Sequence, residues 1–199
     1  MCEGGAVVGP IDGDGRTLRE RMLAGEWYIA DDPEIEAAAR RAHRLMEAFN
    51  ATAADDSSRR HELLTALLGG LGDDTVIRPP LYIDYGSSLS VGRRCFVNYG
   101  LVALDVAAIT IGDDVQIATN VQLLTPTHPL NAAQRRDKWE AAQPISIGDN
   151  VWLGGGVIVC PGVSIGADTV VGAGSVVVDD LPSGVLAVGN PARVIRQLT

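Results

Sequence analysis

One histidine in this chain of 199 residues is a candidate for acid–base chemistry. His128 lies between Thr127 and Pro129, in a polar stretch that lacks the apolar pattern of its surroundings. An imidazole group titrates near neutral pH, so it can remove a proton from a hydroxyl group. The other two histidines, His43 and His61, lie beside arginines and are expected on solvated helix faces. His128 is therefore the candidate general base, with an ordinary surface histidine as the alternative interpretation.

Other catalytic constellations are missing from the sequence. It has no Gly-x-Ser-x-Gly elbow and no phosphate-binding loop with its lysine. Its three cysteines, Cys2, Cys95 and Cys160, are scattered without metal-ligand spacing, which argues against a zinc site and a disulfide framework. We expect Cys95 to be a packed core thiol, and we expect no metal requirement.

Charge and hydrophobicity exclude several classes of protein. The chain carries 25 acidic and 16 basic residues, a formal net charge of −9, whereas a nucleic-acid binder needs a basic face. Its hydrophobic share of 46% is ordinary for a globular protein, and no apolar run is long enough to span a bilayer. The N-terminus does not resemble a secretory signal. We therefore expect a cytoplasmic protein without membrane or nucleic-acid partners.

Residue usage divides the chain near residue 72. Residues 17–72 contain no Val and two Ile, whereas residues 73–199 contain 19 Val and 10 Ile. Because β-branched residues favour strands over helices, this shift predicts a helical segment followed by a β domain. The glycine-rich residues 1–16 are expected to form a flexible tail.

Local signals predict three helices in the first part. Thr17 and Glu20 have the spacing of a capping box. Asp32-Pro33-Glu34 combines a cap, a proline in the first turn and an acid that suits the helix dipole. A third helix is expected from about Ser57 to Leu68, because leucines recur on one side.

The second part has a period of six residues. This spacing fits neither the 3.6-residue period of a helix nor the alternation of a strand. It is typical of a parallel β-helix, in which each repeat forms one flat face and three repeats form a turn. An ordinary β-sandwich is the alternative. The thirteen positions of this series are Ile83, Leu89, Cys95, Leu101, Ile111, Ile117, Leu123, Ile147, Leu153, Val159, Ile165, Val171 and Val177.

Two interruptions of the period mark candidate functional segments. The step from Leu101 to Ile111 is ten residues, which implies an insertion of four residues near Asp105. Residues 124–144 replace the apolar pattern with polar and charged residues, so a long loop that carries His128 is expected there. Long loops on a rigid scaffold often carry functional residues.

Four stretches share their residues with a known family. They are Met22-Leu-Ala-Gly-Glu-Trp-Tyr, Thr125-Pro-Thr-His-Pro-Leu, Ile147-Gly-Asp-Asn-Val-Trp-Leu-Gly-Gly and Gly189-Asn-Pro-Ala-Arg-Val-Ile-Arg. These motifs resemble the sugar O-acetyltransferases of the hexapeptide-repeat superfamily, in particular the maltose, galactoside and nodulation-sugar enzymes. The resemblance implies a mainly β chain, a left-handed parallel β-helix with an N-terminal α-helical segment. It further implies a homotrimer that transfers an acetyl group from acetyl-CoA to a sugar hydroxyl at clefts between subunits.

The resemblance also assigns roles to residues around the acceptor. His128 would be the general base, and Asn98 would hold the acceptor and orient it toward that base. Asp105 would bind acceptor hydroxyl groups, with the capping of the insertion turn as the alternative. Asp32 would face the acceptor, although the neighbouring Asp31 competes for this role. Without the resemblance, Asn98 is a corner residue whose side chain satisfies the backbone.

A second set of residues would hold the donor. By resemblance, backbone groups of Gly155 and Ala173 contact the CoA arm, and the Gly155 amide stabilises the tetrahedral oxyanion. Arg193 and Arg196 would meet the CoA phosphates, or else form an exposed face of the C-terminal segment. The family often has Ser or Arg at Gly155 and Thr-Lys at Val178-Asp179, so a weaker hold on the nucleotide is expected here.

The resulting hypothesis is direct acetyl transfer without an acyl-enzyme. A thioester is already activated, so positioning and one base suffice in principle. One alternative keeps the fold but changes the acceptor to an antibiotic, an amino acid or an amino sugar. Another is a non-catalytic β-helix that binds a partner, against which the presence of His128, Asn98 and Asp105 argues.

Overall fold

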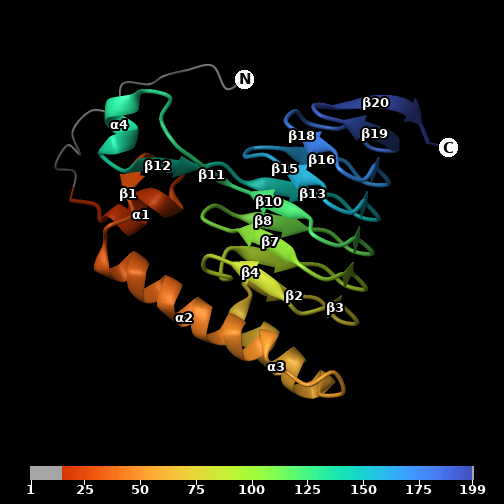
Figure 1. Ribbon diagram of the computed structural model, residues 1–199, viewed down its shortest axis with the longest axis horizontal. Coiled ribbons are helices and arrows are strands. Elements are labelled where there is room, and N and C mark those ends of the chain that lie inside the picture. The colour runs from red at the N-terminus through yellow and green to blue at the C-terminus, as the bar shows by residue number, and fades with distance from the viewer. Residues whose placement is uncertain (1–14, 199) are drawn as a thin grey trace.

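The computed structural model describes residues 15–198 (Figure 1). The expected flexible tail, apart from residues 15 and 16, lies outside the described residues, as does Cys2. The described chain consists of an N-terminal helical segment, a β-helix and a hairpin that leaves the β-helix (Figure 1). Within the described residues, no helix combines the length and apolar character needed to cross a membrane.

The helical segment begins at the predicted capping signals. Thr17 Oγ1 accepts the Glu20 amide hydrogen at 3.1 Å, and the Glu20 carboxylate accepts the Thr17 amide hydrogen at 2.7 Å, which forms the capping box. The structure contains all three predicted helices, so this prediction is confirmed. The elements of this segment are α1 (Leu18–Leu23), β1 (Tyr28–Ile29), α2 (Pro33–Asn50) and α3 (Ser57–Leu67).

Three parallel sheets form the faces of the β-helix. The first face contains β2 (Gly70–Leu71), β5 (Leu89–Val91), β8 (Ile109–Ile111), β13 (Ile145–Ile147) and β16 (Ser164–Ile165). The second face contains β3 (Val76–Ile77), β6 (Phe96–Val97), β9 (Gln116–Ile117), β14 (Trp152–Leu153), β17 (Val170–Val171), β19 (Val185–Gly189) and the antiparallel β20 (Ala192–Gln197). The third face contains β4 (Leu81–Ile83), β7 (Leu101–Leu104), β10 (Gln122–Leu124), β15 (Ile158–Val159) and β18 (Val176–Val177). The predicted fold class is thereby confirmed.

The six-residue series fills the interior of this prism. All thirteen positions of the series are buried, with an exposed fraction of 4% or less. Strand register stacks equivalent positions of successive turns, for example Leu123 beside Val159 and Val159 beside Val177. Cys95 is one of these core residues, as predicted, and burial raises the pKa of its thiol. No repeat buries its apolar side chains alone, so each turn depends on its neighbours.

Glycine at the corners is explained by the close stacking of turns. A Cβ atom at Gly154 would lie 2.5 Å from the backbone nitrogen of Ala173 in the next turn. Gly154 does not have a positive φ, so the requirement is space between turns and not backbone freedom.

Two edges of the prism matter for the candidate site. The loop corner joins the third face to the next first face and comprises residues 84–88, 105–108, 125–144, 160–163 and 178–180. The Asn98 corner joins the second face to the third and comprises residues 78–80, 98–100, 118–121, 154–157 and 172–175. These two corners are different edges of the same prism.

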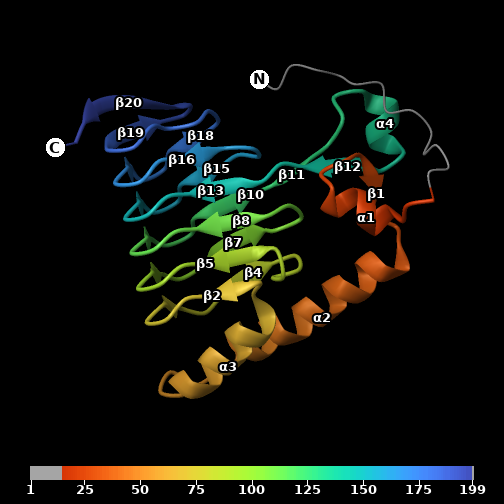
Figure 2. The same ribbon diagram turned by 180° about the vertical axis from the view of Figure 1, so that it is seen from behind.

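Helices α2 and α3 cover the first turn of the β-helix (Figure 2). Phe49 is fully buried between these helices and the core. The side chain of Asn50 bonds to the backbone of Leu81 in β4: its Nδ2 donates to the carbonyl oxygen at 2.8 Å, and its Oδ1 accepts the amide hydrogen at 2.8 Å. The amide group of Asn50 thus fills the position of a strand below β4.

The expected long loop is a structured hairpin. It contains β11 (Pro126–Thr127), α4 (Ala132–Arg136) and β12 (Trp139–Ala142), and it projects from the prism toward α1 and β1 (Figures 1 and 2). β12 pairs with β11 on one side and with β1 on the other, in a small antiparallel sheet. Because β1 is remote in sequence, periodicity alone could not predict this sheet.

Candidate active site

The base of the hairpin is fixed by one threonine. Thr125 is fully buried, and its hydroxyl group donates to the carbonyl oxygen of Leu104 at 2.6 Å. The Thr125 hydroxyl oxygen also accepts the amide hydrogen of Ala107 at 3.0 Å, and the Thr125 carbonyl oxygen accepts the amide hydrogen of Gln143 at 3.0 Å. The two ends of the hairpin are therefore joined to each other and to the turn below.

His128 lies just after β11, on this hairpin. Its Nδ1 is 3.2 Å from the carbonyl oxygen of Trp139. A carbonyl oxygen only accepts hydrogen bonds, so Nδ1 carries the proton of the neutral ring and Nε2 keeps its lone pair. The side chain is 54% exposed. The geometry thus presents a nitrogen that can take a proton from a bound molecule.

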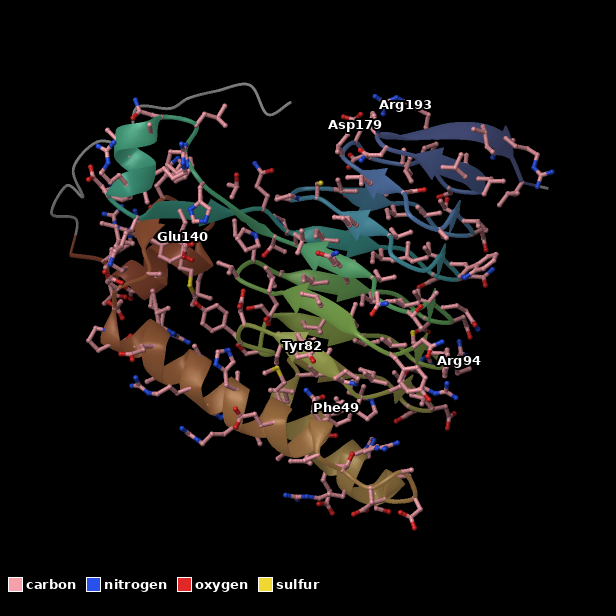
Figure 3. All side chains as sticks on the ribbon, in the orientation of Figure 1. Phe49, Tyr82, Arg94, Glu140, Asp179 and Arg193 are labelled. Carbon is pink, nitrogen blue, oxygen red and sulfur yellow. The ribbon has the colours of Figure 1, made fainter. Side chains whose placement is uncertain are left out.

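Glu140, which Figure 3 labels, belongs to β12 and lies beside that nitrogen. Its Oε2 is 3.9 Å from His128 Nε2, and its side chain is only 17% exposed. A carboxylate at this distance stabilises the imidazolium that forms when the base accepts a proton. Glu140 was missed by sequence reasoning, because it comes next to His128 only through the pairing of β11 and β12.

Tyr28 supports Glu140 from the N-terminal segment. It is fully buried, and its hydroxyl group donates to Oε1 of Glu140 across the β1–β12 pair. Burial and the hydrogen bond to Glu140 raise the pKa of Tyr28, so the phenol remains a neutral donor. Tyr28 lies inside a motif that the sequence analysis quoted, but its role depends on a strand pairing that the motif does not reveal.

Asp105 is fully buried at the loop corner. Its Oδ1 accepts the amide hydrogen of Tyr85 at 2.8 Å, and its Oδ2 accepts that of Ser88 at 3.1 Å. Burial raises the pKa of this carboxyl group, whereas the backbone amides oppose the shift. In this chain both carboxylate oxygens of Asp105 accept backbone amide hydrogens and are shielded from solvent, and the acceptor contact expected of Asp105 stays a prediction. The alternative, a residue that holds a turn, fits this geometry.

Asp84 is a second partly buried acid of this corner and was not predicted. Burial, with a contribution from Asp105, raises its pKa to about 6, while His43 opposes the shift. Glu140 contributes further to the rise. The loop corner thus gathers acidic groups below the hairpin that carries His128.

Asp32 and Asp31 have different partners. Oδ1 of Asp32 accepts the amide hydrogens of Glu34 at 2.8 Å and Ile35 at 3.2 Å, which makes Asp32 the N-cap of α2. This oxygen is used by the helix, and the acceptor contact expected of Asp32 stays a prediction. Asp31 forms an ion pair with Lys138 of the hairpin, and both side chains are exposed.

Asn98, Gly155 and Ala173 lie along the Asn98 corner. Backbone hydrogen bonds stack its turns: Asn120 donates to Tyr99, Gly156 to Thr119 and Gly174 to Gly155, at 2.8–2.9 Å. The side-chain oxygen of Asn98 accepts the amide hydrogen of Tyr99 at 2.9 Å. The structure therefore brings these three predicted residues to one edge, but in a single chain it does not bring them to the edge that carries His128.

The two predicted arginines lie on β20. Nη1 of Arg193 is 3.2 Å from Oδ2 of Asp179, which lies at the last turn of the loop corner (Figure 3). Arg196 lies opposite Leu186 of β19 and is exposed. Both guanidinium groups are thus accessible at the C-terminal end of the prism.

Comparison with known proteins bears on this arrangement. Residues 21–72 match the maltose acetyltransferase hexapeptide capping motif, and residues 144–179 match the bacterial transferase hexapeptide model of six repeats. Galactoside O-acetyltransferase of Escherichia coli K12 is 36% identical over 181 residues, which cover 91% of this chain and 89% of the relative. The chain belongs to the hexapeptide-repeat acetyltransferases.

Solved structures and a second relative agree with this membership. A maltose O-acetyltransferase from Clostridium difficile 630 superposes on this acetyltransferase with a TM-score of 0.91 and 40% identity, over 92% of this chain and 98% of that one. A galactoside acetyltransferase in complex with coenzyme A gives a TM-score of 0.89 and 36% identity, over 92% of each chain. Nodulation protein L of Rhizobium meliloti is 46% identical over 90% of this chain and 98% of its own.

The hairpin of this acetyltransferase carries an imidazole and a carboxylate, and β1 adds a buried phenol. Together they can take up, stabilise and release one proton. Among residues 15–198, no group of three or more His, Cys, Asp or Glu residues could hold a metal ion.

Proposed function

We propose that this acetyltransferase transfers an acetyl group from acetyl-CoA to a hydroxyl group of a sugar or a sugar-like acceptor. The observation that carries the proposal is the environment of His128: Nδ1 is engaged by the Trp139 carbonyl group, and Nε2 stays available beside Glu140. The names of its relatives, which include maltose and galactoside O-acetyltransferases, support the donor and the acceptor class.

The proposed reaction needs one base and no covalent intermediate on the enzyme. Nε2 of His128 takes the proton of the acceptor hydroxyl group while its oxygen attacks the carbonyl carbon of the thioester. Glu140 stabilises the resulting imidazolium, and the bond between carbon and sulfur breaks as the tetrahedral intermediate collapses. The imidazolium returns its proton to the thiolate of CoA, so that ester and free thiol leave. Cys95 is enclosed in the core and is no candidate for an acyl-enzyme.

A pocket of about 440 Å³ supports a neutral, hydroxyl-rich acceptor. It opens at the loop corner, between the end of α1 and the first face, and it shares Ala142 with the hairpin strand β12. Four of its twelve lining residues carry a hydroxyl group, and none carries a charged side chain; the four are Ser87, Ser88, Ser90 and Thr110. Such a lining suits hydrogen bonding to a sugar better than pairing with a cationic amine.

A homotrimer is part of the proposal. His128 lies on one edge of the prism, and Asn98, Gly155 and Ala173 lie on another. A site that uses all four residues therefore needs two chains, and a closed three-fold ring gives each chain one such neighbour. Asn98 remains the proposed acceptor contact, and Gly155 and Ala173 remain the proposed contacts to the CoA arm. A cytoplasmic location is also proposed, because acetyl-CoA is available there.

The proposal is tested by following the release of free CoA with a panel of acceptors. The panel contains monosaccharides, disaccharides and glycosides, with aminoglycosides and serine as competing classes. We expect turnover with at least one neutral sugar and product ester that is cleaved by mild base. Turnover restricted to amines, with a base-stable amide as product, would replace the sugar acceptor by an amino acceptor. If no acceptor of either class led to the release of CoA, the proposal would be contradicted.

A further inference from the structure

The C-terminal end of the prism carries a pair of opposite charges that the proposed chemistry does not require. Nη1 of Arg193 lies 3.2 Å from Oδ2 of Asp179 and also donates to the carbonyl oxygen of Ala192 at 2.9 Å. The two charged side chains are 62% and 67% exposed, respectively. Figure 3 shows them together at the end of the molecule opposite to α3. Arg193 is therefore accessible, but its charge is offset by a neighbour.

The surrounding charges set Asp179 apart from other acids. The next residue, Asp180, is engaged by the fold, because its Oδ1 accepts the amide hydrogen of Ser164 at 2.7 Å. On the same strand as Arg193, Arg196 takes part in no ion pair among the residues that the structure describes. Of the two arginines on β20, Arg193 is thus paired with a carboxylate, whereas Arg196 has no ion pair among the described residues.

We propose that Asp179 lowers the affinity of this enzyme for the phosphate groups of its donor by offsetting the charge of Arg193. The inference rests on the proposed function and on the expectation, drawn from the family resemblance, that Arg193 and Arg196 meet the phosphates of CoA. The ligand chemistry is that of a phosphate, either the 3′-phosphate of the ribose or the pyrophosphate.

Asp179 acts through the electric field at the guanidinium group of Arg193. An exposed ion pair is weak, so a phosphate can displace the carboxylate from the guanidinium group at little cost. The displaced carboxylate stays on the neighbouring turn, and salt near physiological strength screens its repulsion only over a length of about 8–10 Å. The chain already has a net charge of −9, so a polyanionic donor gains little from long-range attraction. Asp179 therefore acts on donor affinity without touching the reacting atoms.

The test measures the dissociation constants of CoA and dephospho-CoA by calorimetry, at low salt and at about 0.3 M salt. The variants are Asp179→Asn, Arg193→Gln and the combination of both. The matched control is Asp55→Asn, which removes the same charge from an exposed position between α2 and α3, at the other end of the prism. All affected side chains are exposed, and thermal unfolding verifies that each variant is folded.

We expect Asp179→Asn to bind CoA about three- to ten-fold more tightly at low salt, with a smaller gain at high salt. Arg193→Gln should bind CoA more weakly, the double variant should resemble the wild type, and Asp55→Asn should not differ from it. A gain for CoA alone assigns Arg193 to the 3′-phosphate, and a gain for both ligands assigns it to the pyrophosphate.

Two negative results have different meanings. If wild type and Asp179→Asn bind CoA with the same affinity at low salt, the inference about Asp179 is overturned while the proposed function stands. If no variant binds CoA at all, the proposed function itself is overturned.

Discussion

Tyr28 and Glu140 are 112 residues apart in the chain, and the phenol of the first donates a hydrogen bond to the carboxylate of the second. Tyr28 belongs to β1 of the N-terminal segment and Glu140 to β12 of the hairpin that carries His128, so this bond joins the two segments. The two residues are also register partners in the β1–β12 pair. The helical segment is thus part of the support of the candidate base. Removal of this segment should therefore affect catalysis as well as stability.

Replacing His128 with Ala should lower kcat by roughly 10²–10⁴-fold while the dissociation constant of CoA stays unchanged, because only proton transfer is lost. Initial rates and calorimetry measure the two quantities. His61→Ala is the matched control, since His61 is an exposed histidine on α3, and it should keep full activity. Near-normal turnover of the His128 variant would exclude it as the base.

Replacing Glu140 with Gln should lower kcat by about 10-fold or more, because the imidazolium loses the carboxylate 3.9 Å from Nε2. The side chain keeps its shape and an acceptor oxygen for Tyr28, so the fold should be retained. A loss in kcat with an unchanged KM for acetyl-CoA is expected, and Glu62→Gln on the exposed side of α3 serves as control. Unchanged kcat would show that the charge of Glu140 does not contribute.

Replacing Asp32 with Ala separates a structural role from an acceptor contact. Loss of the N-cap of α2 should lower the free energy of unfolding by about 0.5–2 kcal/mol, and Asp32→Ser should recover most of it. Because the capping oxygen is used by the helix, the acceptor KM should hardly change. Urea unfolding and steady-state kinetics measure both effects. A large rise in acceptor KM with full recovery by Asn but not by Ser would restore Asp32 to the acceptor site.

Asp84 should make the protein less stable at neutral pH than at mildly acidic pH. Its folded-state pKa of about 6 lies above the ordinary value of 3.8, so between these pH values the folded chain binds more protons than the unfolded one. This contribution to stability is present below about pH 4 and is lost as pH rises toward 6. Asp84→Asn should therefore raise the free energy of unfolding at pH 7 by about 1–3 kcal/mol.

The test compares urea unfolding of Asp84→Asn and wild type from pH 4 to pH 7 at one protein concentration. The difference between the two proteins should shrink as the pH falls. Asp55→Asn, an exposed acid, should show no such trend. An Asn variant that is less stable than the wild type at pH 7 would mean that the Asp84 carboxylate is favoured by the fold.

Mixed oligomers test whether the site is shared between chains. His128→Ala and Asn98→Ala should each be nearly inactive, but unfolding and refolding them together should recover about a quarter of the wild-type activity in randomly mixed trimers. The estimate follows because about three quarters of the trimers are mixed, and one of three sites in each then has both native residues. Mixing the His128→Ala chain with a chain that carries both substitutions should recover no activity. Absence of recovery in verified mixed trimers would place both residues of each site in one chain.

The repetitive part of the fold is predictable because every turn needs an apolar residue at the same inward position. The inward position of Leu123, Val159 and Val177 follows from the period alone, since each must cover the next. Helix caps are equally local, and at Asp32 the cap explains the side chain better than the acceptor contact inferred from resemblance.

The site is harder to predict because it depends on contacts between distant segments. Glu140 becomes relevant only when β12 pairs with β11 and β1, and neither pairing leaves a periodic pattern. Asp105 illustrates the opposite case: an acid at an insertion has the chemistry of a ligand, but its burial and its amide partners are visible only in the folded chain.

The side chain of Asn50 has a consequence for the behaviour of this protein in concentrated solution. A solenoid ends in strands whose unpaired backbone groups can template the addition of another molecule, as in fibrils. Asn50 occupies the donor and the acceptor of Leu81 on the outermost strand of the third face. In an Asn50→Ala chain both backbone groups of Leu81 would lose this partner, so the amide group of Asn50 adds to the cover that α2 and α3 give this end against stacking end to end.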